Sequence, residues 1–521
     1  MFTISENPVT ALIVLAAAVV LVWGLYRSIK YGKLGILAWL QSVVLMAPWL
    51  LFFGLFGLGI YINLDTVLFL IVASAGLYIY LGKKMRAAGT DSLLQQRRSD
   101  KIKSIEETSK ELEKKEAIEE TSKESEKKET AEKASPTKEI MPGIIPAEDI
   151  KKIQDIFGVV TFFATETIPY QEGAIFKGNL RGEPAAVHQR LSASLSEKLG
   201  DRYRLFLVEN PEGRPVAIVL PSRNDPQTTT VGQKILAVIL ALATIVTSLA
   251  AGGLLQGFDI FSDFSRGMVK AGPIAIGIWA VLLAHEIGHR LIAKRYEVRI
   301  GWPFFLPTWQ IGSFGSLNRF ESLLPNRQVL FDVAIAGPAA GGILSLGMLI
   351  AGLLLSHPGS LFQVPSQLFQ GSILVGTLAR VVMGSALGQQ LVDVHPLTII
   401  GWIGLVITAI NLMPAGQLDG GRIVQAIYGR KVAGLTTIAT LIVLAIASLA
   451  NPLALYWAAL IVFLQRDLER PSLNEITEPD DQRAALALLA LFLMLVTLIP
   501  LSSTLAGQLL SAVSQLLAVS S

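Results

Sequence analysis

The sequence predicts a multi-pass membrane protein of α-helices, with about ten transmembrane helices and a small soluble α+β domain inserted before the main helical core. Hydrophobic residues make up 52% of the 521 residues and charged residues only 16%. The mean hydropathy is +0.53. Several apolar runs reach the length of about 20 residues that a helix needs to cross a hydrocarbon core. This composition is too apolar for an ordinary water-soluble protein.

The composition also narrows the chemistry that the chain can perform. It contains no cysteine, which excludes disulfides, thiol catalysis and cysteine-ligated metals. Any metal site must therefore use His, Asp or Glu side chains, and the chain has only five histidines. The net charge of +3 is small for this length and gives no case for nucleic-acid binding.

Three apolar runs near the N-terminus predict transmembrane helices, at about 8–26, 36–60 and 66–81. No Lys or Arg precedes the first run, which predicts a retained span rather than a cleaved signal peptide. Basic residues follow the first and third runs, so the positive-inside rule places the N-terminus outside and the chain after Arg86 inside.

The stretch after these runs is charged and repetitive. IEETSKELEKKE at 105–116 recurs as IEETSKESEKKE at 118–129, a period of 13 residues. A coiled-coil arm is one interpretation, but a 13-residue step does not maintain a heptad and apolar residues are scarce. A solvated, transiently helical linker fits this composition better.

Residues 145–225 have the composition of a soluble domain. The expected elements are helices at 148–156 and 183–199, and strands near 159–164, 204–209 and 215–220. This order favours a small α+β domain. The GNLRG stretch at 178–182 is expected to be a loop or tight turn.

After Lys234 the chain is almost wholly apolar. The expected spans are 235–255, 272–293, 331–354, 396–414, 432–449, 452–466 and 483–502. The predicted domains are an N-terminal membrane region at 1–86, a linker at 87–144, the soluble domain at 145–225, the main core at 234–470, and a C-terminal linker and helix at 471–521.

The strongest local motif is His285-Glu286-Ile287-Gly288-His289, inside the apolar run 274–293. On a helix, positions i and i+4 share a face, so His285 and His289 can bind one zinc ion. Glu286 can then take the proton of a metal-bound water. A buried polar cluster that only stabilises helix packing is the alternative. Ionisable groups deep in a membrane helix are more often functional.

A third protein ligand is needed, and Asp419 is the best candidate. It ends the segment NLMPAGQLD at 411–419, just after an apolar run. Pro414, Gly416, Gly420 and Gly421 are expected to break the helix there and leave backbone that lines a cavity. Asn411 can donate a hydrogen bond to a substrate carbonyl or oxyanion. A glycine-rich helix end at the bilayer surface is the other interpretation.

Together the two motifs resemble the site-2 protease family of membrane-embedded zinc metalloproteases. The resemblance implies that His285, His289 and Asp419 bind Zn²⁺, that Glu286 is the catalytic base, and that Asn411 assists binding of the substrate or transition state. It covers roughly residues 145–470.

The chain is most similar to the branch of this family found in cyanobacteria and chloroplasts, the ethylene-dependent gravitropism-deficient and yellow-green proteases. GNLRG at 178–182, GSFG at 312–315 and Asn318-Arg319 carry this similarity. The similarity implies a cyanobacterial plasma or thylakoid membrane, or a chloroplast membrane. One departure is GPAAG at 337–341, where many members have G-P-x-x-N.

The run 371–390, which contains Arg380, decides the topology. If it crossed the bilayer, Asp419 would emerge on the face opposite the histidines. A re-entrant or surface segment instead brings Asp419 to the histidines and gives ten spans. We expect the second arrangement.

The loop 296–328 is rich in tryptophan, phenylalanine and proline. It is expected either to form a β-hairpin that offers a strand edge to an unwound substrate, or to lie as an aromatic belt at the headgroups.

The expected function is therefore an intramembrane metalloprotease that cleaves membrane proteins in or near a transmembrane helix. The alternative is a metal or ion transporter that uses the same His and Asp residues. A Glu beside the first His favours hydrolysis, because transport does not need it. The sequence indicates neither the natural substrate nor the oligomeric state.

Overall fold

The computed structural model describes residues 145–500, except 171, 211, 261–263, 449–451 and 466, and a few short helical pieces between residues 24 and 84. The chain divides into two compact units, 1–137 and 138–521, and the elements below belong to the second. The repeat linker and nearly all of the three predicted N-terminal spans lie outside the described residues.

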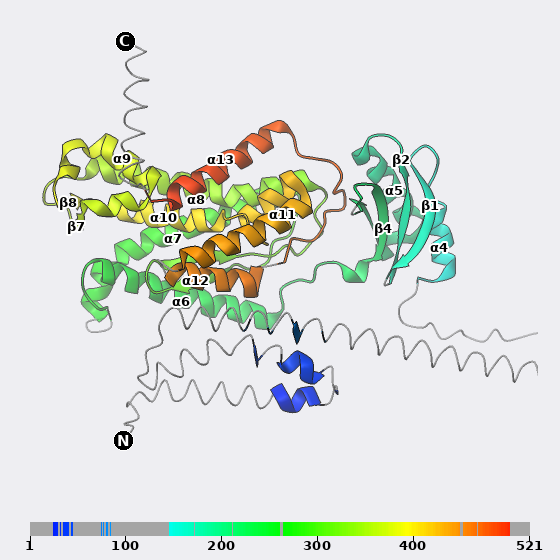
Figure 1. The fold of residues 1–521 in the computed structure, drawn as a ribbon, viewed down its shortest axis with the longest axis horizontal. Helices are drawn as coiled ribbons and strands as arrows, with labels where there is room; N and C mark the ends of the chain where they lie inside the picture. The colour runs from blue at the N-terminus through cyan, green and yellow to red at the C-terminus, as the bar shows by residue number, and fades with distance from the viewer. Residues whose placement is uncertain are drawn as a thin grey trace, which may run out of the picture. The chain divides into compact units, whose positions relative to one another are not determined.

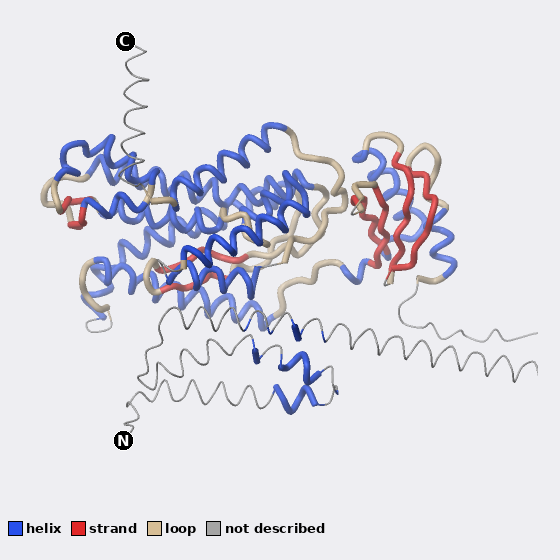
Figure 2. Tube along the Cα trace, viewed as in Figure 1, coloured by secondary structure: helices blue, strands red, loops and turns tan. Residues whose placement is uncertain are grey.

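The soluble part is a four-stranded antiparallel sheet with two helices (Figures 1 and 2). Its strand order is β1-β2-β4-β3. The elements are α4 (Ala147–Gln154), β1 (Phe162–Tyr170), β2 (Gly173–Leu180), α5 (Pro184–Leu199), β3 (Tyr203–Glu209) and β4 (Pro215–Pro221). Ile153 of α4 and Leu191 of α5 are buried with Phe162 and Phe176 of the sheet in one core.

The prediction of a loop at 178–182 was wrong for its first three residues, which end strand β2. Gly178 pairs with Ala164 across the sheet. A Cβ atom on Gly178 would lie 2.1 Å from the carbonyl oxygen of Phe163, so only glycine permits this close pairing. Two glycines in five residues are typical of a turn, but here the first serves a close contact between strands.

The helical core is built around α8 (Arg327–Leu355), which packs against α7, α9, α10 and α11 (Figure 1). The other helices of this core are α6 (Val231–Leu255), α7 (Phe264–Arg295), α9 (Ile373–Met383), α10 (Pro396–Asn411), α11 (Asp419–Ala447), α12 (Pro452–Leu460) and α13 (Asp481–Leu498). Four clusters of buried apolar side chains fill the contacts between the described helices.

Among the described residues, α6, α7, α8, α11 and α13 are long and apolar enough to cross a membrane. Large apolar side chains on α6, such as Ile235, Ile239 and Leu242, are more than half exposed. Such a surface is unfavourable in water and suits lipid. Helix α10 has 16 residues and is shorter than these five. The count of ten spans therefore stays a prediction.

Two predicted spans have different bounds from those expected. The span expected at 432–449 belongs to α11, which already begins at Asp419 and is kinked at Gly429, where φ is 81°. The span expected at 452–466 is divided between α12 and a π-helical turn at Ile461–Gln465.

The two ends of the segment around 371–390 lie side by side. Strand β7 (Phe362–Pro365) pairs antiparallel with β8 (Leu391–Val394), with Phe362 opposite Val394. Between them α9 has 11 residues. A helix of this length spans roughly 16 Å, about half of a hydrocarbon core. This geometry agrees with the re-entrant or surface arrangement that the sequence favours.

The loop after α7 does form a β-hairpin, from β5 (Phe304–Thr308) and β6 (Gly312–Leu317). It packs against α6. The indole side chains before and after β5 are about half exposed, with Trp302 at 47% and Trp309 at 51%. The hairpin is thus present, and its exposed tryptophans also keep the interpretation as an aromatic belt open.

Candidate metal centre

Helix α7 supplies the histidines and the glutamate of the site. His285 and His289 are one helical turn apart, and both are buried with Glu286. Ile287, between them in the sequence, is 52% exposed and lies on another face of the helix. The spacing that predicts a shared face is therefore realised in the structure.

Asp419 reaches the histidines from the first residue of α11. The break that precedes it is short, because α10 ends at Asn411 and α11 begins at Asp419. Gly420 and Gly421 were expected in the break but lie in the first turn of α11. A Cβ on Gly420 would lie 1.8 Å from the carbonyl oxygen of Leu412, so glycine lets this turn pack against the end of α10.

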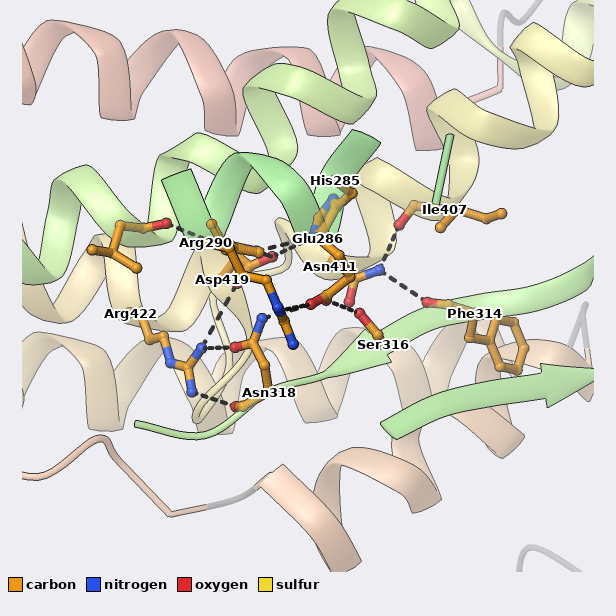
Figure 3. Close-up of polar contacts among 12 residues, drawn as sticks. His285, Glu286, Arg290, Phe314, Ser316, Asn318, Ile407, Asn411, Asp419 and Arg422 are labelled. Atoms are coloured by element: carbon orange, nitrogen blue, oxygen red, sulfur yellow. Dashed lines mark hydrogen bonds and ion pairs between the residues drawn. The ribbon is translucent and has the colours of Figure 1, made fainter. Parts of the chain in front are cut away.

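The three side chains converge on one point, and Figure 3 shows two of them, His285 and Asp419. The Nε2 atom of His285 lies 3.1 Å from Oδ2 of Asp419 and 3.1 Å from Nε2 of His289. Nε2 of His289 lies 3.4 Å from the same carboxylate oxygen. In tetrahedral zinc with bonds of about 2.0–2.1 Å, ligand atoms are about 3.3–3.4 Å apart. The donor set and its spacing therefore fit zinc.

The orientation of His289 leaves its outer nitrogen available to a metal. Its Nδ1 lies 2.7 Å from the carbonyl oxygen of Val333 on α8. A carbonyl only accepts, so Nδ1 carries the proton and Nε2 keeps its lone pair. Hydrogen bonds of this kind typically fix metal-ligating histidines.

The GPAAG segment at 337–341, where this chain departs from G-P-x-x-N, lies directly against the histidines. A Cβ on Gly337 would lie 2.1 Å from Nε2 of His289, and one on Gly341 would lie 3.1 Å from Cβ of His285. Gly341 stands where many members have Asn. In this chain α8 therefore presents backbone to His285 at that position, and no side-chain amide.

Three side chains that the sequence analysis did not assign to the site surround the carboxylate of Glu286 (Figure 3). Nη1 of Arg290 donates over 2.9 Å, and the hydroxyl of Ser316 on β6 donates to Oε1. Nδ2 of Asn318 lies 3.5 Å from the same oxygen. Arg290 could have been found from its i+4 spacing to Glu286. The contacts of Ser316 and Asn318 depend on how the hairpin folds back.

Asn411 is buried at the end of α10, beside the hairpin. Its amide nitrogen donates to the carbonyl oxygens of Phe314, over 2.9 Å, and Ile407, over 2.7 Å. Both amide hydrogens are thus used within the protein. The structure brings Asn411 to the strand that carries Ser316, as Figure 3 shows.

Comparison with known proteins assigns both parts of the chain. The model of peptidase family M50 matches residues 273–450, and the model of the EGY3 middle domain matches residues 151–227. No solved structure matches the chain.

Plant relatives match over much of the chain. The chain is 39% identical over 363 residues to the probable zinc metalloprotease EGY2, chloroplastic, of Arabidopsis thaliana, covering 68% of this chain and 65% of the relative. It is 37% identical over 404 residues to the Arabidopsis EGY1 protein of the same description, covering 70% of this chain and 74% of the relative. The corresponding EGY3 protein of Oryza sativa subsp. japonica is 30% identical over 390 residues, covering 70% and 66%.

The two converging motifs, the helical core and these matches define the class: the chain belongs to peptidase family M50, the zinc metalloproteases of site-2 type. Within it, the relatives found are the EGY1, EGY2 and EGY3 proteins of chloroplasts, as the resemblance implied. The chain spans about two thirds of the length of the EGY2 relative.

Proposed function

We propose that this chain is an intramembrane endopeptidase that hydrolyses peptide bonds in or near the transmembrane segments of membrane proteins. In this proposal His285, His289 and Asp419 hold one zinc ion. The supporting observation is the convergence of three buried ligand atoms, 3.1–3.4 Å apart, beside the carboxylate of Glu286 within an apolar bundle of helices.

Each residue has a part in the proposed reaction. Zinc, when bound, polarises the scissile carbonyl and lowers the pKa of water to about 7. Glu286 takes the proton of the attacking water and passes it to the leaving nitrogen. Arg290 and Ser316 hold the carboxylate of Glu286 in place. Both amide hydrogens of Asn411 are used within the protein, so in this proposal it assists binding of the substrate or transition state by holding the strand of Ser316 through the carbonyl oxygen of Phe314.

The hairpin supports a substrate in extended form. Strand β6 belongs to a two-stranded sheet and carries Ser316, whose hydroxyl contacts Glu286. A pocket of about 430 Å³ lies beside Arg290, lined by Trp302, Phe305 and residues of α6. The free edge of a strand can pair with an unwound segment of substrate, and the pocket, which Phe305 of β5 lines, can take a large apolar side chain. Substrates should therefore need residues that destabilise a helix near the cut.

The relatives and the composition support a location in a membrane. The named relatives are chloroplastic proteins. We infer that this chain is an integral protein of a cyanobacterial plasma or thylakoid membrane, or of a chloroplast membrane. A metal or ion transporter would not need Glu286, the proton acceptor beside His285. The relatives found are named as proteases or peptidases.

The test is reconstitution of the purified chain in vesicles with a model single-span substrate. Wild-type protein should cleave it in the presence of zinc, and a chelator should stop cleavage. Glu286→Gln should lower kcat by about 10²- to 10⁴-fold, because it removes the proton acceptor. It should retain zinc, because Glu286 is not a ligand. Undiminished cleavage by this variant would refute the mechanism, and zinc uptake into vesicles without peptide products would support transport.

A further inference from the structure

Arg422 is a buried charge three residues after Asp419. Only 2% of its surface is exposed. Nε donates to Oε2 of Glu469 over 3.0 Å, and the guanidinium lies 4.8 Å from the ring centre of Phe320. A buried ion pair seldom adds net stability over apolar packing of the same volume. The position of this pair beside the proposed ligands therefore points to a role in the site.

The first contact of Arg422 with the site passes through Asn318 (Figure 3). Nη1 donates to Oδ1 of Asn318 over 2.7 Å, and Nη2 donates to its backbone carbonyl over 2.8 Å. A guanidinium can only donate, so it fixes which end of the amide is the oxygen. The NH₂ end of Asn318 must then face Oε1 of Glu286, 3.5 Å away.

The second contact is with the proposed ligand Asp419. Nη1 of Arg422 lies 3.9 Å from Oδ1, whereas Oδ2 faces His285 and His289. The cation thus attracts one oxygen of the carboxylate and leaves the other toward the histidines. Arg422 and Asp419 lie three residues apart at the start of one helix, so this geometry is set by the helix.

We propose that Arg422 is a positioning residue for both carboxylates of the site. It orients Asp419 directly and Glu286 through Asn318, while Glu469 balances its charge. This inference rests on the proposed function for its effect on turnover, but its effect on metal affinity can be measured without turnover. Lysine cannot replace Arg422, because a single ammonium cannot donate to Glu469 and both oxygens of Asn318 in the same fixed fork.

The experiment compares Arg422→Gln, Arg422→Lys and Asn318→Asp in the full chain. Zinc Kd is measured on metal-free protein by competition with a chelator, and kcat and KM are measured with the model substrate. Both Arg422 variants should raise zinc Kd and lower kcat at least about tenfold, the effect typical of residues that hold metal ligands. Asn318→Asp keeps a partner for Arg422 but turns an acceptor toward Glu286. It should lower kcat at least about tenfold and leave zinc Kd within about twofold.

Arg327→Gln is the matched control. Arg327 is also buried, and its Nε and Nη2 donate to the carbonyls of Ala426 and Ile427 on α11, the helix of Arg422. Its loss should reduce thermal stability with zinc Kd and kcat within about twofold of wild type. Unchanged zinc Kd and kcat in Arg422→Gln, or equal losses in Arg327→Gln, would overturn the inference. Absence of cleavage by wild-type protein would instead contradict the proposed function, and the zinc Kd values would still test Arg422.

Discussion

At the scale of single residues, the site depends on the absence of side chains as much as on their presence. Gly337 and Gly341 let α8 approach the imidazoles of α7. Small residues bring membrane helices close together in this way. The carbonyl of Val333 can then hold Nδ1 of His289 at 2.7 Å.

Gly337→Ala should therefore impair the metal centre without impairing the fold. Its methyl group would lie 2.1 Å from Nε2 of His289, so the imidazole must move. Alanine is also the better helix former, by about 1 kcal/mol, so the helix itself should not weaken. We expect zinc Kd to rise at least about tenfold. The measurement is chelator competition, with circular dichroism as a check on folding.

Gly347→Ala is the control for this variant, because it lies on the same helix with nothing within 4 Å of an added Cβ. Its zinc Kd should equal that of wild type. If Gly337→Ala also binds zinc as wild type does, the three residues do not hold the metal as proposed.

The residue scale also shows which parts of the site the sequence could predict. The pairing of His285 with His289 follows from helical spacing alone. Asp419 lies 134 positions after His285. Predicting that it belongs to the same site required a second motif and a family resemblance. Asn318 and Arg422 could not be found this way, because their contacts arise only when the strand after α7 folds back onto α11.

At the scale of elements, the predictions from sequence were wrong at positions where glycine or polar residues contribute to close packing. Glycine made the end of β2 look like a turn and the start of α11 look like a break. In both places the glycine allows a backbone to approach within a distance that a Cβ would prevent. The long apolar helices were predicted well, because their composition reports burial or lipid directly.

The β7–β8 pair predicts that the residues on either side of α9 lie on the same side of the membrane. Gln363 lies opposite Asp393 in this pair, so the residues before and after α9 are neighbours. Short protease-cleavable tags inserted after Gly359 and after Gln390 should therefore be cut from the same side of sealed vesicles. A tag after Glu297, between α7 and α8, is the control, because one long helix separates it from Gly359.

The expected result is that the tag after Glu297 is cut from the opposite side, because α8 lies between the two insertion points. If the tags at Gly359 and Gln390 were cut from opposite sides, α9 would have to cross the bilayer and the arrangement proposed here would be wrong.

At the scale of the whole described unit, one segment joins the sheet to the helical core. Leu207 of β3 donates its N–H to the carbonyl of Leu473 over 2.8 Å and accepts from Glu475 over 2.9 Å. Leu473 in turn donates to the carbonyl of Leu324, just before α8, over 2.8 Å. The same stretch of chain begins near Glu469, the partner of Arg422.

The soluble part should lose stability in mild acid because of His188. Burial lowers the pKa of His188 below its usual value of 6.5, and Nε2 lies 3.1 Å from the carbonyl of Leu205. The folded state therefore favours the neutral ring, and the unfolded chain binds the proton first. Stability is complete above about pH 6.5 and falls as the pH drops below it.

The measurement is hydrogen exchange of α5 and β3 in the full chain between about pH 7 and about pH 5, corrected for intrinsic rates. Protection should fall with pH in wild type. His188→Gln should flatten this dependence, and a slope that stays the same in the variant would exclude His188 as its cause.

Because β7 pairs with β8, the chain between them begins and ends at the same place. This segment therefore adds no net crossing of the membrane. A chain that leaves and re-enters at one point can carry a longer, shorter or different insertion there without inverting the helices after it. The odd or even number of crossings between His289 and Asp419 then depends only on α8 and α10. In this arrangement the side on which the proposed metal ligands emerge does not depend on the length of the chain between β7 and β8.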